Sequence, residues 1–268
     1  VAGDKSKPLM LFLHGFPESA FSWDYYLEFF ANKGFYCVAP DQRGYNLSAK
    51  PKGSINYSVD KLSKDIIELA DSLQQESFYL IGHDWGAIVA WDVAINYSER
   101  IKKLIVINVP HPKVALEKIK NSPSQMLKSW YMFIFQIPEI PEMMFRAFNF
   151  AINWNMMKFS ANEGSFTASK KQAYVDCWKI EGAASGMINW YRALFQYPQD
   201  YDDSKLETET LILWGKNDQF LGFNMAEESL NYCKKANLID FDDATHWLQH
   251  EFPEKVSSHI HSFISEKA

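Results

Sequence analysis

Short runs of apolar residues alternate along the chain with longer segments whose apolar residues recur at helical spacing. The runs lack a polar face, which is typical of parallel strands covered by helices on both sides of a sheet. They predict strands at 9–13, 36–39, 78–81, 104–107, 211–214 and 236–241.

Helical spacing is clearest in three segments. After Ser58, a candidate N-cap, apolar residues recur at Leu62, Ile66, Leu69, Ala70 and Leu73. Pro253 suits a first helical position and precedes apolar residues at Val256, Ile260, Phe263 and Ile264. The stretch 85–95 is apolar almost all round, which predicts a buried helix. Strands alternating with helices predict an α/β fold with a mostly parallel, doubly wound sheet and right-handed crossovers.

The alternation stops between about 111 and 205, where Trp, Phe, Met and Tyr are frequent and several prolines occur. This segment is expected to be a helical cap inserted into the core. We therefore predict a first core part at 1–110, a cap at 111–205 and a second core part at 206–268.

Composition narrows the class of protein. Hydrophobic residues make up 47% of the 268 residues, enough for a large core. The net charge of −6 and the lack of a basic stripe argue against binding to nucleic acid or attraction to anionic membranes. The three cysteines form no CxxC pair, so we predict free thiols in a reducing compartment; one disulfide plus a free thiol stays the alternative.

No uninterrupted apolar stretch reaches the ~18 residues that a transmembrane helix requires, and no signal peptide is visible. We therefore expect a cytoplasmic protein. The chain begins at Val1 rather than Met, so an upstream segment stays open. The oligomeric state cannot be read from the sequence.

Five residues, Gly82-His83-Asp84-Trp85-Gly86, stand between the strand at 78–81 and the buried helix at 85–95. This is the pattern of a nucleophile elbow, with Asp84 where serine usually stands. Glycines are needed because the turn is tight and strained, and the helix N-terminus favours a negative charge. A glycine-bounded turn with Asp84 as an ordinary N-cap is the alternative.

The first predicted strand is followed by His14-Gly15-Phe16-Pro17. In this fold the corresponding loop gives one N–H to an oxyanion hole, and the residue after the nucleophile gives the other. The backbone N–H groups of Phe16 and Trp85 are therefore the expected donors. His14 is expected to brace the loop without taking part in chemistry.

Asp218 closes the segment Trp214-Gly215-Lys216-Asn217-Asp218, which stands at the end of the predicted strand at 211–214. His246 follows the strand at 236–241. The order Asp84, Asp218, His246 is that of nucleophile, acid and histidine in this fold. The other candidates for the acid lack this strand-end position: Asp202, Asp203, Asp240, Asp242 and Asp243. His250 lies four residues after His246 without an HExxH pattern, so we expect no metal site.

Taken together, the segments at 14–18 and 82–86 resemble the soluble epoxide hydrolase family of the α/β-hydrolase fold. The similarity extends to 41–45 and 108–112 and covers nearly the whole chain. In that family two cap tyrosines act as acids. Their patterns match Tyr131, followed by Phe135 and Gln136, and Tyr191, within Asn189-Trp190-Tyr191-Arg192. Packing of the cap is the alternative role of each tyrosine.

The resemblance implies that an apolar epoxide and water are converted to a vicinal diol without cofactor or metal. Asp84 would form an alkyl ester, and His246, oriented by Asp218, would activate the water that hydrolyses it. The resemblance further implies substrate-binding or water-positioning roles at Glu18, His83, Trp190 and Trp247. In the family a β-hairpin precedes the first strand, whereas only eight residues precede Leu9 here.

A haloalkane dehalogenase, which shares the fold and the Asp nucleophile, is the main alternative function. That family usually has Asn where this chain has Phe16, and it does not need paired cap tyrosines. A fluoroacetate dehalogenase would have Arg in place of Trp85. A binding protein on a hydrolase scaffold would not need the full set of catalytic residues.

Overall fold

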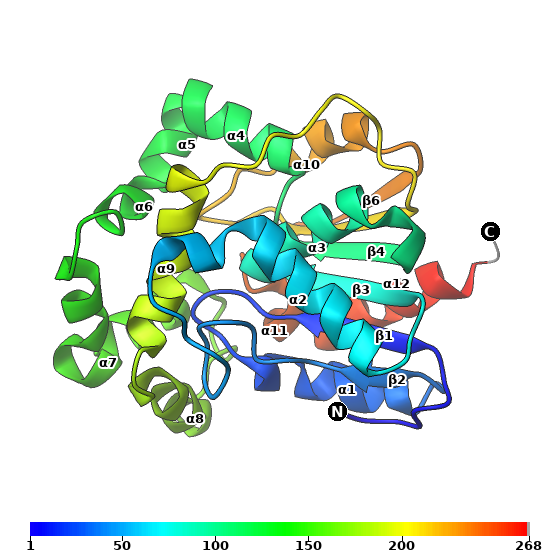
Figure 1. The fold of residues 1–268 in the computed structure, drawn as a ribbon, viewed down its shortest axis with the longest axis horizontal. Coiled ribbons are helices and arrows are strands. Elements are labelled where there is room, and N and C mark those ends of the chain that lie inside the picture. The colour runs from blue at the N-terminus through cyan, green and yellow to red at the C-terminus, as the bar shows by residue number, and fades with distance from the viewer. Residues whose placement is uncertain (267–268) are drawn as a thin grey trace.

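The computed structural model describes residues 1–266 and contains one sheet of six parallel strands in the order β2-β1-β3-β4-β5-β6. Figure 1 shows the sheet at the centre of the molecule. The strands are β1 (Leu9–Leu13), β2 (Tyr36–Val38), β3 (Phe78–His83), β4 (Ile101–Ile107), β5 (Thr210–Gly215) and β6 (Ala236–Phe241). Each predicted apolar run therefore forms a strand, and the fold class predicted from the pattern is confirmed.

Strand β4 begins three residues before its predicted start at Leu104. The early residues pair with β3, but the polar Lys103 interrupts the apolar pattern. Lys103 is nevertheless buried, because its ammonium donates to Phe263 O at 2.8 Å and pairs with Glu209 at 3.0 Å. A buried lysine with satisfied partners thus continues a strand where hydropathy alone suggests a stop.

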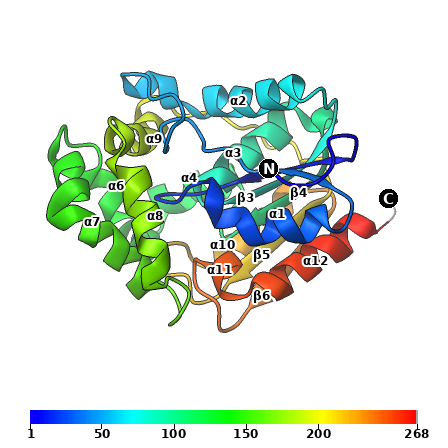
Figure 2. The ribbon, with the colours of Figure 1, turned by 90° about the horizontal axis from the view of Figure 1, so that it is seen from below.

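Helices cover both faces of the sheet. α1 (Asp24–Ala31) and α12 (Pro253–Ser265) pack on one face, and α2 (Val59–Ser72), α3 (Trp85–Asn96) and α10 (Asn224–Ser229) on the other. Figure 2 shows these layers from below, with short α11 (Leu248–Glu251) just before α12. Ser58 does stand at the N-cap of α2, but its hydroxyl donates to Ile55 O instead of capping the helix.

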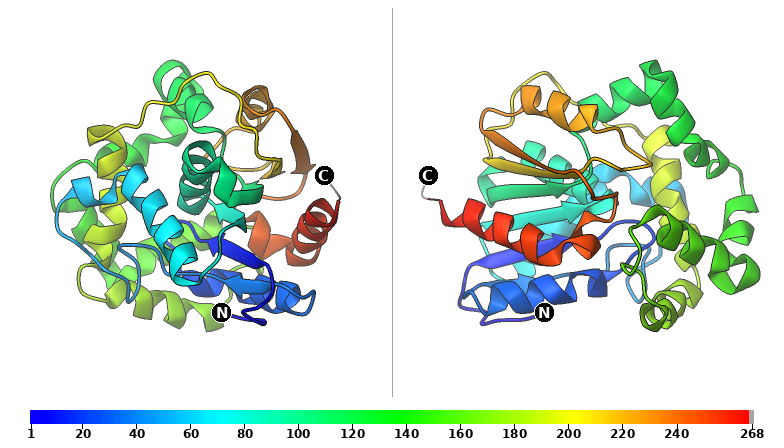
Figure 3. Two further views of the ribbon diagram at one scale, coloured as in Figure 1. Left: turned by 45° about the vertical axis from the view of Figure 1, so that its right-hand side comes forward. Right: turned by 180° about the vertical axis from the view of Figure 1, so that it is seen from behind.

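Six helices lie between β4 and β5, in the segment expected to form the cap. They are α4 (Pro112–Asn121), α5 (Pro123–Lys128), α6 (Trp130–Ile134), α7 (Ile140–Ser160), α8 (Ala168–Lys179) and α9 (Ala183–Gln196). Figures 1 and 3 show them gathered at one end of the molecule, away from the C-terminus. Helix α7 is broken at 147–150, where the backbone leaves the right-handed helical region.

The chain before β1 forms no hairpin within residues 1–266. Instead, Ala2 makes an isolated antiparallel bridge with Cys37 at the outer edge of β2. No helix in this described part is both long enough and apolar enough to cross a bilayer. All three cysteines are unpaired; burial raises the pKa of Cys37 to about 12 and that of Cys233 to about 11, so both stay thiols at neutral pH.

Candidate active site

Asp84 lies between β3 and α3 with φ 49° and ψ −123°, a conformation that is strained for a residue other than glycine. The turn is held by close backbone packing around it. A Cβ on Gly86 would lie 2.1 Å from Leu13 O, and one on Gly82 would lie 2.4 Å from Gly86 O. The glycines therefore permit the tight strand-to-helix turn that places Asp84 at the carboxyl edge of the sheet.

The carboxylate of Asp84 has two distinct oxygens. Oδ1 accepts a hydrogen bond of 2.6 Å from the backbone N–H of Phe16, in the loop after β1. Oδ2 lies 3.6 Å from Nε2 of His246. A Cβ on Gly15 would lie 2.4 Å from the Cβ of Asp84, so only glycine lets this loop approach the carboxylate.

His246 and Asp218 come together at the ends of β6 and β5. Nδ1 of His246 lies 2.7 Å from Oδ2 of Asp218, which is buried. Asp218 also accepts hydrogen bonds from the side chain of Asn108 at 2.8 Å and from the backbone N–H groups of Phe220 and Leu221 at 2.7 and 2.9 Å. Burial raises the pKa of Asp218, but the neighbouring His246 and these hydrogen bonds outweigh it and lower the pKa below its ordinary value.

The two carboxylates also control the charge of His246. Burial alone would lower the pKa of this imidazole, whereas its interactions with Asp218 and Asp84 raise the pKa to about 10. At neutral pH the histidine is therefore an imidazolium. Any reaction that neutralises Asp84 removes one of the two charges that hold the proton on His246.

Two tyrosines from the cap helices stand across the cavity from Asp84. Tyr131 comes from α6 and Tyr191 from α9, and their ring centres are 5.9 Å apart. The ring of Tyr191 also packs edge-on against Trp85 at 4.9 Å. Burial, with the charge of Asp84 adding to it, raises the pKa of each tyrosine well above its ordinary value. Both hydroxyls therefore keep their protons at neutral pH and can donate them.

Asp84, His246 and the two tyrosines face one cavity of about 940 Å³, a volume that includes its open mouth. Its other walls are mostly apolar and come from α3, α4, α6, α9, the segment 197–201 and the loop before α10. They include Ile88, Leu116, Ile119, Met132, Leu194, Phe220 and Leu221. Asp84 and His246 are the only ionisable acid and base among its lining residues apart from tyrosines.

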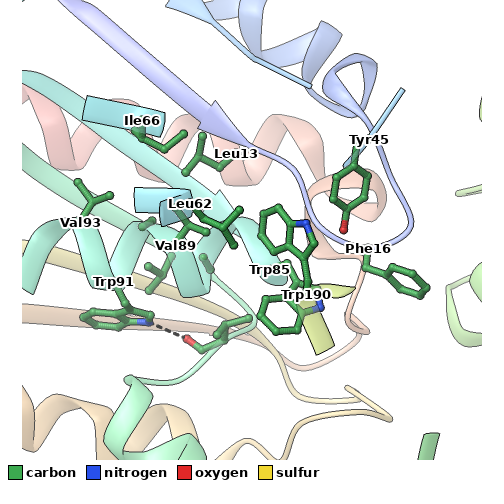
Figure 4. Packing of buried hydrophobic residues seen from close by; sticks show 14 of the residues in the cluster. Leu13, Phe16, Tyr45, Leu62, Ile66, Trp85, Val89, Trp91, Val93 and Trp190 are labelled. Carbon is green, nitrogen blue, oxygen red and sulfur yellow. Dashed lines mark hydrogen bonds between the residues drawn. The ribbon is translucent and has the colours of Figure 1, made fainter. Parts of the chain in front are cut away.

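Trp190 and Trp247, expected to contact substrate, do not line this cavity. Trp190 packs against Trp85 at 5.5 Å and donates its indole N–H to Arg43 O. Figure 4 shows the rings of Trp85 and Trp190 together. Trp247 is buried behind His246, where its indole N–H donates to Ser160 of α7. Both tryptophans brace the site from outside the cavity because each has its polar edge satisfied elsewhere.

Glu18 and His83, expected to position water, also lie outside the cavity lining, in a buried polar cluster. Nδ1 of His83 lies 3.0 Å from Glu18, and its Nε2 lies 2.9 Å from the backbone oxygen of His246. Nε2 of His250 lies 2.5 Å from the other oxygen of Glu18. The cluster therefore contacts His246 through its backbone oxygen and through the ring of His83, which packs against the imidazole of His246 at 4.9 Å.

The charge of Glu18 is set by these partners. Burial raises the pKa of its carboxyl, but the charge of His250 and the hydrogen bonds from both histidines outweigh it, so the pKa lies well below its ordinary value. Sequence reasoning considered His250 only as a metal ligand and missed this pairing. Among residues 1–266, no three acidic, His or Cys side chains are placed to hold a metal ion.

Two further contacts at the site have no clear signal in the sequence. The Asn108 side chain donates to Asp218 and accepts from Gly215 N–H, joining the ends of β4 and β5. The hydroxyl of Tyr201 donates to the buried Asp92 at 2.8 Å and holds the segment that closes the far side of the cavity.

His14 braces its loop as expected, since its Nε2 accepts from the backbone N–H of Gln42.

Comparison with known proteins places this geometry among characterised folds. A family model described as the alpha/beta hydrolase fold matches residues 8–253. Epoxide hydrolase 4 of Homo sapiens is 42% identical over 99% of this chain, which spans 75% of that protein. Epoxide hydrolase 1 of Caenorhabditis elegans is 40% identical over 98% of this chain, which spans 66% of that relative's length, just under two thirds.

Solved structures give the same picture. The crystal structure of an epoxide hydrolase from Bacillus megaterium in complex with an inhibitor is 31% identical, with a TM-score of 0.89. The match covers 99% of this chain and 95% of that protein.

Proposed function

The chain belongs to the α/β-hydrolase fold family and is similar to members that are named epoxide hydrolases. From this premise we propose that it opens apolar epoxides to vicinal diols through a covalent ester on Asp84. The observation that supports this most directly is that the two oxygens of the Asp84 carboxylate have different partners. Phe16 N–H holds Oδ1 of Asp84, while Oδ2 is turned toward the cavity side where His246 lies.

In the first step, Oδ2 of Asp84 attacks a ring carbon of the epoxide. The carbon–oxygen bond of the ring breaks, its electron pair stays on the epoxide oxygen, and that oxygen takes a proton from Tyr131 or Tyr191. Two protonated phenols opposite a carboxylate suit this step, because an epoxide oxygen is a poor leaving group unless it receives a hydrogen bond or a proton. The product is a hydroxyalkyl ester on Asp84.

Ester formation prepares the second step. Asp84 loses its negative charge, so one of the interactions that raise the pKa of His246 disappears. The imidazolium can then give its proton to the tyrosinate left by ring opening, which restores the phenol and leaves a neutral imidazole. His246, oriented by Asp218, then takes a proton from water, and the hydroxide attacks the ester carbonyl carbon. The N–H groups of Phe16 and Trp85 would hold the oxyanion that forms on Oδ1. Its collapse breaks the bond between the carbonyl carbon and the diol oxygen, which takes the proton of the newly added hydroxyl, so that the diol leaves and the Asp84 carboxylate is restored.

Glu18 and His83 enter this scheme as positioning residues. The contact of His83 with the backbone oxygen of His246 would hold the loop that carries the base, and Glu18 holds His83 and His250 in the same cluster. The water that attacks the ester would lie on the cavity side of His246. We therefore assign Glu18, His83 and His250 to the orientation of His246 rather than to contact with the epoxide.

A haloalkane dehalogenase would use the same nucleophile and histidine but must hold a halide with N–H donors. The side chain of Phe16 offers none and packs edge-on against Tyr191 at 5.2 Å. The two phenols suit an oxygen that takes up a proton, whereas a halide leaves as an anion. The arrangement therefore favours an epoxide.

A three-substrate assay tests the proposal. Wild type and Asp84→Ala are each given an aryl epoxide, a haloalkane and a p-nitrophenyl ester. We expect wild type to form diol and Asp84→Ala to form none. Halide release without diol formation would replace the proposal by dehalogenation. Diol formation by Asp84→Ala at the wild-type rate would exclude Asp84 as the nucleophile.

A further inference from the structure

The outer surface of α5, α6 and the first half of α7 exposes many large apolar side chains. Trp130 is 59% exposed, Leu127 75% and Phe148 83%. We call this set of nine residues the cap patch: Met126, Leu127, Trp130, Phe133, Ile137, Ile140, Met143, Met144 and Phe148. They are nine of the 17 exposed large apolar residues described, in less than a tenth of the chain. Such clustering on a protein surface usually marks an interaction site.

The cap patch lies on the back of the cavity wall. Ser129, Tyr131 and Met132 line the cavity, while their chain neighbours Trp130 and Phe133 are exposed. The same short stretch of helix therefore borders the cavity on its inner side and presents apolar rings on its outer side. Figure 1 shows α5, α6 and α7 along one end of the molecule.

One end of the cap patch is built on a strained backbone. Phe148, Asn149 and Phe150 have φ angles of 51°, 53° and 64°, a left-handed conformation that non-glycine residues adopt at a cost. The break buries Phe150 and leaves Phe148 pointing into solvent. Strained backbone is common at functional surfaces, and here it places an exposed phenylalanine beside a buried one.

The local charge around the cap patch indicates which kind of partner covers it. The segment 112–160 carries six Lys or Arg and three Glu, a local charge of +3, although the whole chain carries −6. Lys120, Arg146 and Lys158 are exposed, and none has an acidic partner within residues 1–266. Two copies of this chain facing each other through the cap patch would repel, whereas an anionic lipid surface would attract it.

We propose that the cap patch docks onto the surface of an anionic lipid bilayer. Its apolar rings would enter the boundary between headgroups and acyl chains, and the three unpaired cations would lie among the headgroups. The net charge of the whole chain argues against such attraction, but a bilayer that contacts only this end of the molecule meets the local charge. If the proposed function holds, docking brings the cavity close to the phase in which apolar epoxides dissolve.

Sedimentation with vesicles tests the docking without any substrate, so it stands or falls independently of the proposed reaction. The purified full chain is mixed with vesicles of phosphatidylcholine alone or of phosphatidylcholine with phosphatidylserine, at low and high salt. We expect binding to the vesicles that contain phosphatidylserine, weaker binding at high salt, and little binding to phosphatidylcholine alone.

The triple variant Leu127→Ser/Trp130→Ser/Phe148→Ser should bind these vesicles at least about tenfold more weakly, because it removes three large apolar side chains. Leu47→Ser is the matched control, since Leu47 is 80% exposed but lies in a core loop outside the cap patch. All replaced residues are exposed, so thermal melts should show that both variants fold.

Three outcomes would overturn the proposal. The wild-type chain could fail to sediment with any vesicle. The triple variant could bind as well as Leu47→Ser. Alternatively, gel filtration could show a concentration-dependent dimer that the triple variant loses, in which case the cap patch is an interface between two copies.

Discussion

The backbone N–H of Phe16 donates to Oδ1 of Asp84 at 2.6 Å, so the two oxygens of one carboxylate have different surroundings. Oδ2 lies 3.6 Å from His246 instead. The donor that holds the resting carboxylate is thus already in place for the oxyanion that would form on the same oxygen during ester hydrolysis. Such a preformed donor needs no rearrangement at the moment of reaction.

The histidine should serve the second half-reaction alone. His246→Gln is expected to open one equivalent of epoxide and then stall, because Asp84 needs no base for its attack but the ester needs an activated water. Intact-mass spectrometry after brief exposure should find the protein heavier by one substrate, with the adduct on the peptide that contains Asp84.

Isotope labelling of the wild-type enzyme is the companion measurement. In ¹⁸O-water under single-turnover conditions, the first diol should carry an oxygen from Asp84 and the label should stay on the protein. Label in the first-turnover diol would mean that water attacks the epoxide directly and that Asp84 acts as a base.

The two cap tyrosines are expected to share the role of acid. Tyr131→Phe and Tyr191→Phe should each slow alkylation of Asp84, and the double variant should lose nearly all of the ~10²–10⁴-fold that a general acid contributes. Stopped-flow measurement of the alkylation step checks this. Tyr25→Phe, an exposed tyrosine of α1, is the control and should be unaffected. Normal alkylation by the double variant would place the acid elsewhere.

A methyl group at Gly15 should displace the Asp84 carboxylate directly. Gly15→Ala would put a Cβ 2.4 Å from the Cβ of Asp84, so the loop or the carboxylate must move. Misplacement of this size reduces turnover by on the order of 10²-fold. Gly222→Ala is the control. The atom nearest to its new Cβ is the movable end of the Asn224 side chain, so kcat should change little. Equal kcat values for the two variants would show that the loop tolerates displacement.

The buried Glu18 should make stability depend on pH. Folding lowers the pKa of Glu18 below its ordinary value of 4.5. The ionised carboxylate therefore stabilises the protein fully at pH values above 4.5, and this stability is lost as the pH falls through the lower pKa of the folded state. Glu18→Gln should therefore destabilise the protein at pH 7 by about 3–5 kcal/mol, since it leaves His250 without its partner.

Thermal melts between neutral and acid pH check this dependence. The difference in Tm between wild type and Glu18→Gln should shrink as the pH falls below 4.5, where wild type loses the same interaction. Glu99→Gln, at an exposed position between α3 and β4, should melt like wild type at every pH. A Tm difference that does not change with pH would mean that Glu18 contributes packing rather than charge.

The sequence by itself determined the strands, the chain order of Asp84, Asp218 and His246, and the turn at Asp84. These features are local: an apolar run specifies a buried strand, and glycines around Asp84 specify a strand-to-helix turn. Because the strands are parallel, their carboxyl ends meet at one edge, so residues just after β3, β5 and β6 come together once the topology is known.

Only the tertiary structure decided where side chains without a local signal point. The contact of Glu18 with His250 joins positions 232 residues apart, and nothing near either residue in the chain announces it. Trp190 and Trp247 turn away from the cavity because their indole N–H groups find partners in Arg43 and Ser160, on other elements. The exposed rings of the cap patch likewise follow from how α5, α6 and α7 pack, since an apolar residue is buried only where a neighbouring element covers it.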